Sequence, residues 1–377
     1  MEKPTTYAIP RTAEIRSHRL ESGLVVASTF AGCGGSSLGY EWAGMEVRWA
    51  NEVDPHAALC HRENFPECRL SAQDIRKVLI EDVLADLELR AGQLDVLDGS
   101  PPCQGFSTSG NQQVGDPRNL MFWQFIRLLD GLQPRAFIAE NVPGMWKGRT
   151  HGLFCEVMAL LKSKGYVVEC RELDAQWLGV PQRRRRLIFI GIREDMGIAP
   201  AFPKPLPWRW SVSESCPWIR STQTNRSFRT IQSPGSLPSP TLLTNDARSD
   251  VIAAGHPPID DPEESAPDLA DSVADRESAR VPPGGQSDRY FNLFRAHPDE
   301  PSPCVMAGGG NRGTAGPIHP FEQRKMSILE LRRLCGFPDD FALPGPRARR
   351  WKVLGNAVPP PMMREIALTL RKEIFHK

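Results

Sequence analysis

The sequence predicts an α/β fold, in which a mostly parallel sheet carries helices on both faces and a smaller, loop-rich domain is attached. Over residues 23–194, short apolar runs bounded by turn residues alternate with amphipathic stretches, a pattern typical of strand and helix units. Over residues 195–322, Pro, Ser and Gly become frequent and the periodicity weakens, which indicates loops. The predicted parts are an N-terminal extension (1–22), the sheet domain (23–194), the loop-rich domain (195–322), and a last part (323–377) that ends the loop-rich domain and returns a helix to the sheet domain.

The composition is that of a globular protein with one large domain and an insertion, or with two domains. The 377 residues are 40% hydrophobic and 24% charged, and the formal net charge of +1 indicates no particular partner. The nine cysteines show no repeated Cys-x-x-Cys spacing, so we expect a reduced, cytoplasmic protein without a structural metal site. The polar start and the absence of a long apolar run predict neither a signal peptide nor a membrane span.

The first predicted strand, residues 24–30, leads into a glycine-rich turn and a short helix through Trp42. A strand, a glycine turn and a helix N-terminus form a generic nucleotide cradle. The spacing is not Gly-x-Gly-x-x-Gly and no Lys follows, so a phosphate-binding P-loop is not predicted. Gly32, Gly34 and Gly35 instead allow a ligand close to the backbone, because they carry no side chain.

The second predicted strand starts at residue 46 and ends in acidic residues. An acid about 20 residues past a glycine turn is the arrangement that holds a ribose through its hydroxyls. Asp54 stands before Pro55 and suits the N-cap of a helix over residues 55–64, which leaves Glu52 for the sugar. Farther on, Asp74 either receives an adenine amino group or caps a helix that we expect to run from there through residue 89.

One cysteine follows a predicted buried strand inside a stiff turn. The apolar residues 94–98 suit a parallel strand, and Pro101 and Pro102 end its hydrogen-bond ladder. Cys103 therefore emerges at the carboxyl edge, where open α/β sheets bind their ligands. Free cysteines are commonly buried structural residues. Here the prolines before it and Gln104-Gly after it describe an exposed turn, which favours a reactive thiol.

Another predicted strand, residues 135–142, brings Glu140 to the same edge. A carboxylate at the end of one strand and a thiol at the end of another can face each other across one pocket. After a helix over 151–164 and a strand over 166–173, four arginines (183–186) precede an apolar strand over 187–191. Side chains alternate along a strand, so two arginines can point at the site and two at solvent or phosphate.

The loop-rich domain gives weaker signals. Arg289 and Arg312 lie in glycine-containing loops, where they either contact bases or belong to ordinary turns. Trp208, Trp210 and Trp218 suit the core of this domain better than a stacking platform. Beyond it we expect a helix over 326–335, a basic stretch over 347–352 and a final amphipathic helix to about residue 374.

Five motifs, in order, resemble those of the cytosine-C5 DNA methyltransferase family, and the likeness covers residues 24–191 and 323 to the end. They are Phe30-Ala-Gly-Cys-Gly-Gly35 (cofactor motif), Pro-Pro-Cys103-Gln104 (nucleophile motif), Glu140-Asn-Val142 (acid motif), Gln182-x-Arg184-x-Arg186 (pyrimidine motif) and Gly355-Asn356-Ala-Val-Pro359 (closing motif). Each alone is a modest signal, but the ordered set is not explained by chance. The loop-rich domain falls where this family keeps its target-recognition domain.

The resemblance implies a Rossmann-like S-adenosylmethionine methyltransferase sheet and a DNA (cytosine-5-)-methyltransferase acting on a flipped-out cytosine. The Cys103 thiolate would attack ring C6, and Glu140, protonated or sharing a proton, would bond N3 and the exocyclic amine and stabilise the negative charge. Arg186 would hold O2, and Arg184 would support Glu140 or the nearby backbone. The implied S-adenosylmethionine site, without a metal, comprises Phe30, Ala31, Gly32, Gly34, Gly35, Glu52, Val53, Asp74, Ile75, Ser100, Pro102, Asn356 and Ala357. The implied DNA contacts are Gln104, Ser107, Gln182, Arg289 and Arg312.

The expected protein is a monomeric enzyme of the restriction-modification or prophage kind that acts on double-stranded DNA, separately from any cognate restriction endonuclease. An RNA methyltransferase is disfavoured because the Cys-Phe-Thr stretch typical of the tRNA-modifying branch is absent after Glu140-Asn-Val-Pro-Gly144. The intact motifs argue against an inactive DNA-binding protein. A nicotinamide dehydrogenase would leave the Pro-Pro-Cys turn and the arginine run unexplained.

Overall fold

The structure is a computed structural model that describes residues 2–102, 120–147, 151–219, 273–290, 292–310 and 316–376. The chain forms two compact units, each built from separate stretches of sequence. The sheet unit comprises Thr12–Asp174, Arg185–Lys204 and Val358–Lys377, and the loop-rich unit comprises Met1–Arg11, Ala175–Arg184 and Pro205–Ala357. The loop-rich unit therefore takes in residues at the N-terminus and around 180 that lie outside the predicted range 195–322.

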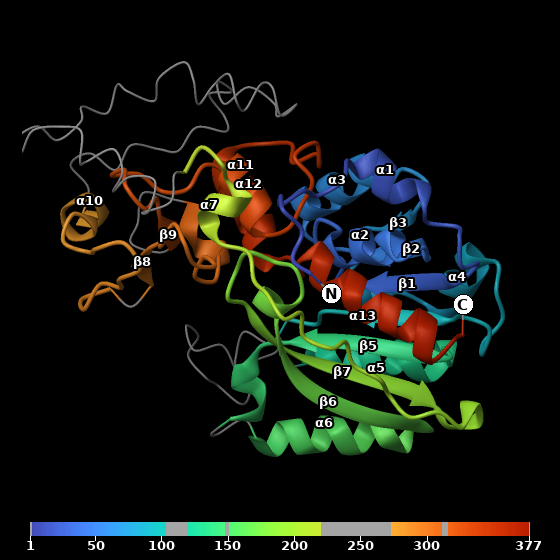
Figure 1. The fold of residues 1–377 in the computed structure, drawn as a ribbon. Coiled ribbons are helices and arrows are strands. Elements are labelled where there is room, and N and C mark those ends of the chain that lie inside the picture. Colours follow the sequence, from blue (N-terminus) through green and yellow to red (C-terminus); the bar gives the residue numbers. More distant parts are fainter. Residues whose placement is uncertain are drawn as a thin grey trace, which may run out of the picture. The chain divides into compact units, whose positions relative to one another are not determined.

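The sheet unit contains seven strands in the order β3-β2-β1-β4-β5-β7-β6 (Figure 1). The strands are β1 (Val25–Thr29), β2 (Glu46–Asn51), β3 (Arg69–Ser71), β4 (Val96–Gly99), β5 (Ala136–Asn141), β6 (Tyr166–Asp174) and β7 (Arg185–Arg193). Strands β1 to β5 pair in parallel, and β7 is antiparallel to both of its neighbours. The predicted α/β class with a mostly parallel sheet is confirmed.

Helices cover both faces of this sheet. Alternate residues of a strand point to opposite faces. Leu97 and Phe137 belong to one set and pack in an apolar core with residues of α4, α5 and α6. Val96 and Ile138 belong to the other set and are also fully buried, so that face is covered as well. The helices are α1 (Thr12–Ser17), α2 (Gly35–Trp42), α3 (Pro55–Asn64), α4 (Ile80–Leu87), α5 (Leu120–Leu132), α6 (His151–Ser163) and α13 (Pro360–Glu373), with short 3-10 turns η1 (Ile75–Lys77), η4 (Pro143–Trp146) and η7 (Glu194–Met196).

One helix prediction is corrected by the structure, and one helix was not predicted. The single helix expected from Asp74 through residue 89 is a 3-10 turn followed by α4, because the backbone at Val78 and Leu79 is extended. The basic stretch 347–352 proves to be the start of a helix, α12 (Arg347–Asn356), in the loop-rich unit. By contrast, Asp54 caps α3 by accepting from the backbone N–H groups of His56 and Ala57, as predicted.

The loop-rich unit has little regular structure among its described residues. It contains η6 (Ala175–Trp177), α7 (Val212–Ser215), α10 (Val273–Ser278), β8 (Leu293–Arg295), η8 (Ala307–Gly310), β9 (Gly316–Ile318), α11 (Ile328–Leu334) and α12. Trp210 is buried between the rings of Tyr7 and Trp208, and the Trp218 indole donates to Glu330 Oε1 at 3.0 Å. These tryptophans thus serve the core of the unit, as their sequence context indicates.

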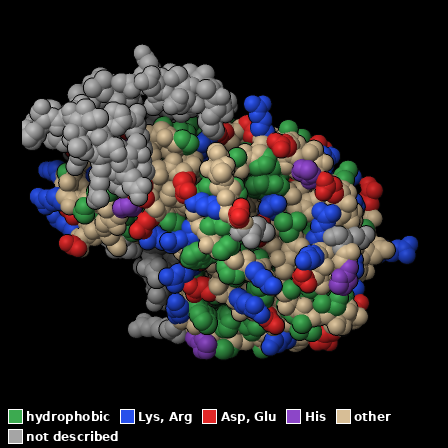
Figure 2. Space-filling view, viewed as in Figure 1, with side chains coloured by type: hydrophobic (Ala, Val, Ile, Leu, Met, Phe, Trp, Pro, Cys, Tyr) green, Lys and Arg blue, Asp and Glu red, His purple; other side chains and the backbone are tan. Residues whose placement is uncertain are grey.

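The surface of the sheet unit mixes charge signs with apolar side chains (Figure 2). Strands β6 and β7 carry the exposed Arg171 and Arg185, and Lys and Arg side chains gather over this part of the unit in Figure 2. Every helix in the described ranges is too short or too polar to span a bilayer.

Gly191→Ala should lower the free energy of unfolding by about 1–3 kcal/mol, because overpacking strains a filled core. A Cβ at residue 191 would lie 2.0 Å from Cε1 of Phe137, its partner across β5 and β7. Urea unfolding followed by circular dichroism measures the change. Gly152→Ala is the matched control, since nothing lies within 4 Å of a Cβ there. It should change stability by less than about 1 kcal/mol, and an equal loss in both variants would contradict the packing argument.

Candidate active site

The carboxyl ends of four strands meet at one edge of the sheet. Thr29 of β1 pairs with Asn51 of β2 and with Gly99 of β4, and Gly99 pairs with Ala139 of β5. The residues that follow these strand ends are therefore neighbours. Strand β7 is antiparallel, so its beginning, rather than its end, reaches the same edge.

The glycine turn after β1 is held in an unusual backbone conformation. Phe30 adopts φ 54°, a left-handed value that is strained for an aromatic residue, and Gly32 and Gly34 have φ of 60° and 98°. A Cβ at Gly34 would lie 2.3 Å from the Phe65 ring, whereas one at Gly32 would meet nothing within 4 Å. The turn is therefore packed from below at Gly34 and open above Gly32, which leaves room for a ligand.

Glu52 lies over this open turn. Its carboxylate accepts from the backbone N–H of Gly32 at 2.8 Å and from that of Asp54 at 2.7 Å. Burial raises the pKa of the Glu52 carboxyl, while these two amides oppose the shift. The next residue, Val53, is an apolar side chain that is 60% exposed. A half-buried acid beside an exposed apolar side chain is suited to a ligand with hydroxyl groups and a planar ring.

The other residues of the sheet unit that were predicted to surround the cofactor differ in burial and in their hydrogen-bond partners. Asp74 accepts from the Arg76 backbone N–H at 3.0 Å and pairs with its guanidinium, which lowers the pKa of the Asp74 carboxyl to about 2. Capping is thus the use that the structure shows for Asp74. Ile75 is buried, and Ser100 and Pro102 are half-buried after β4.

Glu140 and Arg186 form an ion pair at the mouth of the sheet. Arg186 Nε lies 2.6 Å from Glu140 Oε1, and Glu140 is 8% exposed. The pair follows from the strand directions, because Glu140 lies next to the last residue of β5 and Arg186 is the second residue of β7. The adjacent Asn141 donates from Nδ2 to the backbone oxygen of Pro101 at 3.3 Å. The turn after β4 is therefore tied directly to the strand that carries the carboxylate.

The arginine run alternates as predicted. Arg183 and Arg185 are exposed, Arg184 is 2% exposed and Arg186 points at Glu140. Arg184 donates within the loop-rich unit to the backbone oxygens of Val305 at 3.3 Å, Gly355 at 3.1 Å and Asn356 at 3.4 Å. Of the two roles considered for Arg184, the structure shows support of the nearby backbone.

Gln182 is fully buried in the loop-rich unit. Its amide donates to the Leu334 backbone oxygen at 3.1 Å and accepts from the Val305 N–H at 3.2 Å. The Gln182 amide therefore hydrogen-bonds protein backbone groups in this structure, and it holds the loop around Val305 in place. Gln182 and Arg184 together hold the backbone of residues 304–305 and 355–356.

Asp98 is a buried acid at this edge that sequence reasoning missed. It lies next to the last residue of β4, is 1% exposed, and accepts from Ser28 Oγ at 2.8 Å and from the Tyr40 hydroxyl at 3.2 Å. The pKa of the Asp98 carboxyl is raised to about 7, mainly by burial and to a smaller extent by the charge of Glu140, while the hydroxyl donors oppose the shift. The only sequence signal was an acid inside an apolar strand.

The remaining predicted site residues lie outside the described residues or belong to the loop-rich unit. Cys103, Gln104, Ser107 and Arg312 lie outside the described residues. Asn356 and Ala357 end α12 in the loop-rich unit, Asn356 exposed and Ala357 buried. Arg289 is exposed in the same unit, with its guanidinium over the Tyr290 ring. Among the described residues, no group of three or more His, Cys, Asp or Glu side chains is placed to hold a metal ion.

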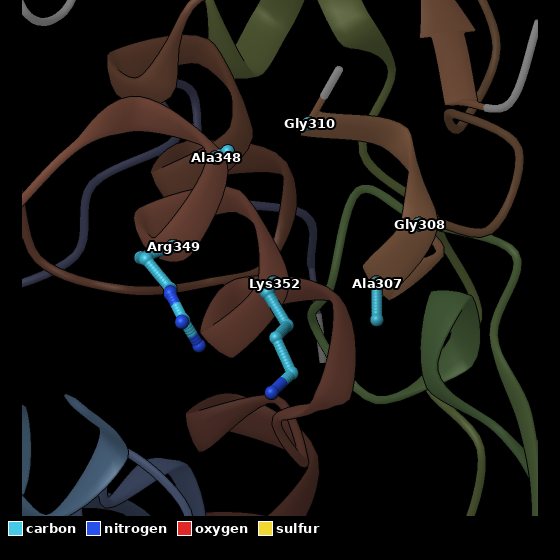
Figure 3. A pocket seen from close by; sticks show the side chains of 6 residues that line it. All are labelled: Ala307, Gly308, Gly310, Ala348, Arg349 and Lys352. Atoms are coloured by element: carbon cyan, nitrogen blue, oxygen red, sulfur yellow. The ribbon is translucent and has the colours of Figure 1, made fainter. Parts of the chain in front are cut away.

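A cationic cavity of about 210 Å³ lies between η8 and α12 in the loop-rich unit (Figure 3). Its lining is formed by Ala307, Gly308, Gly310, Ala348, Arg349 and Lys352. Figure 3 shows the Arg349 and Lys352 side chains running from α12 in the same direction. A Cβ at Gly308 would meet nothing within 4 Å, whereas one at Gly309 would lie 2.4 Å from Cζ2 of Trp351.

Comparison with known proteins identifies the family. The model of the family described as C-5 cytosine-specific DNA methylase matches residues 24–372. The type II methyltransferase M1.HphI of Haemophilus parahaemolyticus is 30% identical over 356 residues, with coverage of 93% of this chain and 87% of the relative. M.NgoPII of Neisseria gonorrhoeae is 29% identical, with coverage of 93% and 96%.

Solved structures share the fold. A prophage-encoded E. coli protein described as a DNA modification methyltransferase superposes with a TM-score of 0.70 at 23% identity, covering 93% of this chain and 99% of that chain. The Dnmt2 methyltransferase of S. pombe superposes with a TM-score of 0.59 at 17% identity, covering 94% and 100%. With the family model matching nearly the whole sequence, the chain belongs to the C-5 cytosine-specific DNA methylase family and is a DNA (cytosine-5-)-methyltransferase.

Proposed function

We propose that this enzyme methylates C5 of a cytosine flipped out of double-stranded DNA, through a covalent bond between Cys103 and ring C6. The observation that carries the proposal is the buried Glu140–Arg186 pair beside the turn that leads to Cys103. This pair offers two groups at one edge. The Glu140 carboxyl group matches the N3 and amine side of a cytosine ring when it carries or shares a proton, and the Arg186 guanidinium matches the O2 side.

The residues around the glycine turn fit S-adenosylmethionine, the methyl donor that this family uses. The open space above Gly32 allows a close approach to the backbone, Glu52 is placed for ribose hydroxyls, and Val53 offers an apolar surface to adenine. Phe30, Ala31, Gly34, Gly35, Ile75, Ser100 and Pro102 complete the proposed site, with Asp74 shaping the backbone near Ile75. We assign Asn356 and Ala357 to it from the family resemblance. When bound, the cofactor supplies a methyl group on a positively charged sulfur.

The protein groups act on the cytosine ring. Addition of the Cys103 thiolate to C6 pushes electrons toward N3 and C5, and Glu140, which carries or shares a proton at this step, donates it in a hydrogen bond to N3 and so stabilises the negative charge there. Arg186 binds O2 while it keeps Glu140 in place. Carbon C5 becomes nucleophilic enough to accept a methyl group. It then loses its proton to a water molecule as the sulfur–C6 bond breaks and the Cys103 thiolate is regenerated. Arg184 and Gln182 position the loops around residues 305 and 355.

The cavity between η8 and α12 is suited to a backbone phosphate of the DNA. Arg349 and Lys352 stand one helical turn apart on α12, and no carboxylate in the described ranges pairs with Arg349. The volume of about 210 Å³ admits a phosphate group together with water. Gly308 leaves the opposite wall open. We assign Arg289 and Arg312, with Gln104 and Ser107, to further DNA contacts from their loop positions in the sequence.

The biological setting is part of the proposal. The curated relatives are type II methyltransferases, which supports a role in restriction and modification, or in a prophage, for this chain. We infer that it works as a cytoplasmic monomer and that any cognate endonuclease acts separately, because one sheet unit and one loop-rich unit hold all the motifs.

Cys103→Ala should abolish methylation completely, because the covalent adduct cannot form. The measurement is bisulfite sequencing of plasmid DNA from a methylation-deficient bacterial host that expresses either protein. Wild type should protect cytosines within one short sequence context and Cys103→Ala should protect none. Unprotected DNA with folded wild-type protein would refute the DNA-methylating function and would favour an RNA substrate.

Arg186→Ala should lower kcat/KM by about 100-fold, since it removes the group proposed for O2 and leaves Glu140 buried without its partner. Incorporation of labelled methyl groups into DNA measures the loss. Arg185→Ala is the matched control, because Arg185 is 64% exposed and pairs with Glu172. Its kcat/KM should stay within about twofold of wild type, and equal losses in both variants would argue against a specific role for Arg186.

Arg349→Ala should weaken DNA binding and reduce the slope of log Kd against log salt concentration by about 0.9, the value for one lost phosphate contact. Fluorescence anisotropy with a labelled duplex measures both quantities. Lys372→Ala, at a side chain that is 82% exposed in α13, removes one charge elsewhere and should leave the slope unchanged. An unchanged slope for Arg349→Ala would refute the proposal that this cavity binds a DNA phosphate.

A further inference from the structure

We propose that Asp98 is a positioning residue for the methyl transfer, whose buried carboxyl group joins the glycine turn and α2 to the end of β4 and the Pro101-Pro102 turn. This inference rests on the proposed function, because it concerns how two parts of that site are held together. Asp98 contacts neither the cytosine nor the cofactor in this proposal. It acts through the hydroxyl groups that surround it.

The carboxyl group collects donors from two elements. Ser28 of β1 is the register partner of Asp98 across the parallel pair and donates to Oδ2 at 2.8 Å. Tyr40, on the fourth helical position after Ser36, donates to Oδ1 at 3.2 Å, and the Ser36 side chain also hydrogen-bonds the carboxyl group. Ser36 directly follows Gly35 at the start of α2. One acid therefore fixes β1 and the first turns of α2 at the same time.

The backbone around Asp98 is equally constrained. Its carbonyl oxygen accepts from Thr29 Oγ1 at 3.0 Å, and the next residue, Gly99, has no space for a side chain, because a Cβ there would lie 2.5 Å from Thr29 Oγ1. Beyond Gly99, the Pro101 oxygen is held by Asn141. The end of β4 is thus attached to the cofactor side by Asp98 and to the Glu140 side by Asn141.

If residue 98 served only the stability of the sheet, an apolar side chain would suffice and no carboxyl group would be required. Burying a carboxyl group in an apolar sheet is unfavourable unless its hydrogen bonds are satisfied, and Ser28, Ser36 and Tyr40 are all placed to satisfy this one. Within the part of the chain that the structure describes, these donors come from β1 and α2, the two elements that flank the glycine turn. This choice of partners indicates that the group serves the turn rather than the general stability of the sheet.

The carboxyl group also makes the link sensitive to pH. The titratable groups that act on it are Tyr40 from α2 and Glu140 from β5. Because its pKa lies near 7 in the fold and near 3.8 in the unfolded chain, the folded protein binds the extra proton in between. Stability contributed by Asp98 therefore falls as pH rises from about 4 to about 7. Asparagine at this position mimics the protonated acid and does not titrate.

The test compares Asp98→Ala, Asp98→Asn and Tyr40→Phe with a control on the same strand, Asp95→Asn. Asp95 precedes β4 at its opposite end and accepts from the Val25 N–H and from Arg135 Nη1, both at 2.9 Å. Isothermal titration calorimetry gives the Kd for S-adenosylmethionine, methyl incorporation into DNA gives kcat and KM, and thermal unfolding across pH gives Tm.

Asp98→Ala should raise the S-adenosylmethionine Kd by about tenfold and lower kcat, and Tyr40→Phe should raise Kd by a smaller factor. Asp98→Asn should stay closer to wild type than Asp98→Ala, and its Tm relative to wild type should rise between about pH 4 and about pH 7. Asp95→Asn should leave Kd and kcat unchanged.

Folded Asp98→Ala with wild-type Kd and kcat would overturn the proposal. Should Asp98→Ala not fold, unchanged Kd in both Asp98→Asn and Tyr40→Phe, together with a Tm difference that is independent of pH, would do the same. A wild-type protein that binds S-adenosylmethionine but transfers no methyl group to DNA would refute the proposed function alone, since the Kd comparison still decides the role of Asp98. Wild-type protein that does not bind the cofactor would overturn both.

Discussion

The ion pair between Arg186 and Glu140 depends on the reversed direction of one strand. In a wholly parallel sheet, the beginning of β7 would lie at the opposite edge from the end of β5. Because β7 is antiparallel, the arginine near its beginning meets the carboxylate near the end of its neighbour. A carboxylate that is only 8% exposed needs such a charged partner. Through Asn141, the same strand end also holds the turn after β4. The architecture of the edge therefore follows from this single reversal.

Strands were predictable wherever a local pattern determined them. Apolar runs bounded by turn residues located all the central strands, and the period of two separated the buried Arg184 from the exposed Arg185. Asp54 before Pro55 located the start of α3 because capping is local chemistry. The α12 helix was missed for a physical reason, since Arg347, Arg349 and Arg350 stand at the positive end of its dipole, where anionic residues are expected.

Partners across the fold were not predictable. The role of Asp98 depends on its hydrogen bonds with Ser28, which lies 70 residues away in the sequence, and with Tyr40, which α2 places beside the end of β4. Gln182 was expected at the DNA, yet its amide is used by Leu334 and Val305. In both cases a polar side chain has several chemically equivalent uses, and only the tertiary arrangement selects one of them. The motif spacing located the site, whereas the contacts that hold it depend on register.

The glycines around Trp351 show how evolution is constrained in the loop-rich unit. A Cβ at Gly309 or Gly316 would approach the indole within 2.4 or 2.7 Å, and one at Gly310 would lie 2.9 Å from the Cα of Ala348. None of these positions can gain a side chain while the tryptophan stays. A lineage that changes the wall of the cavity must therefore replace several of these residues together, and the exposed Gly308 is the position left to vary alone.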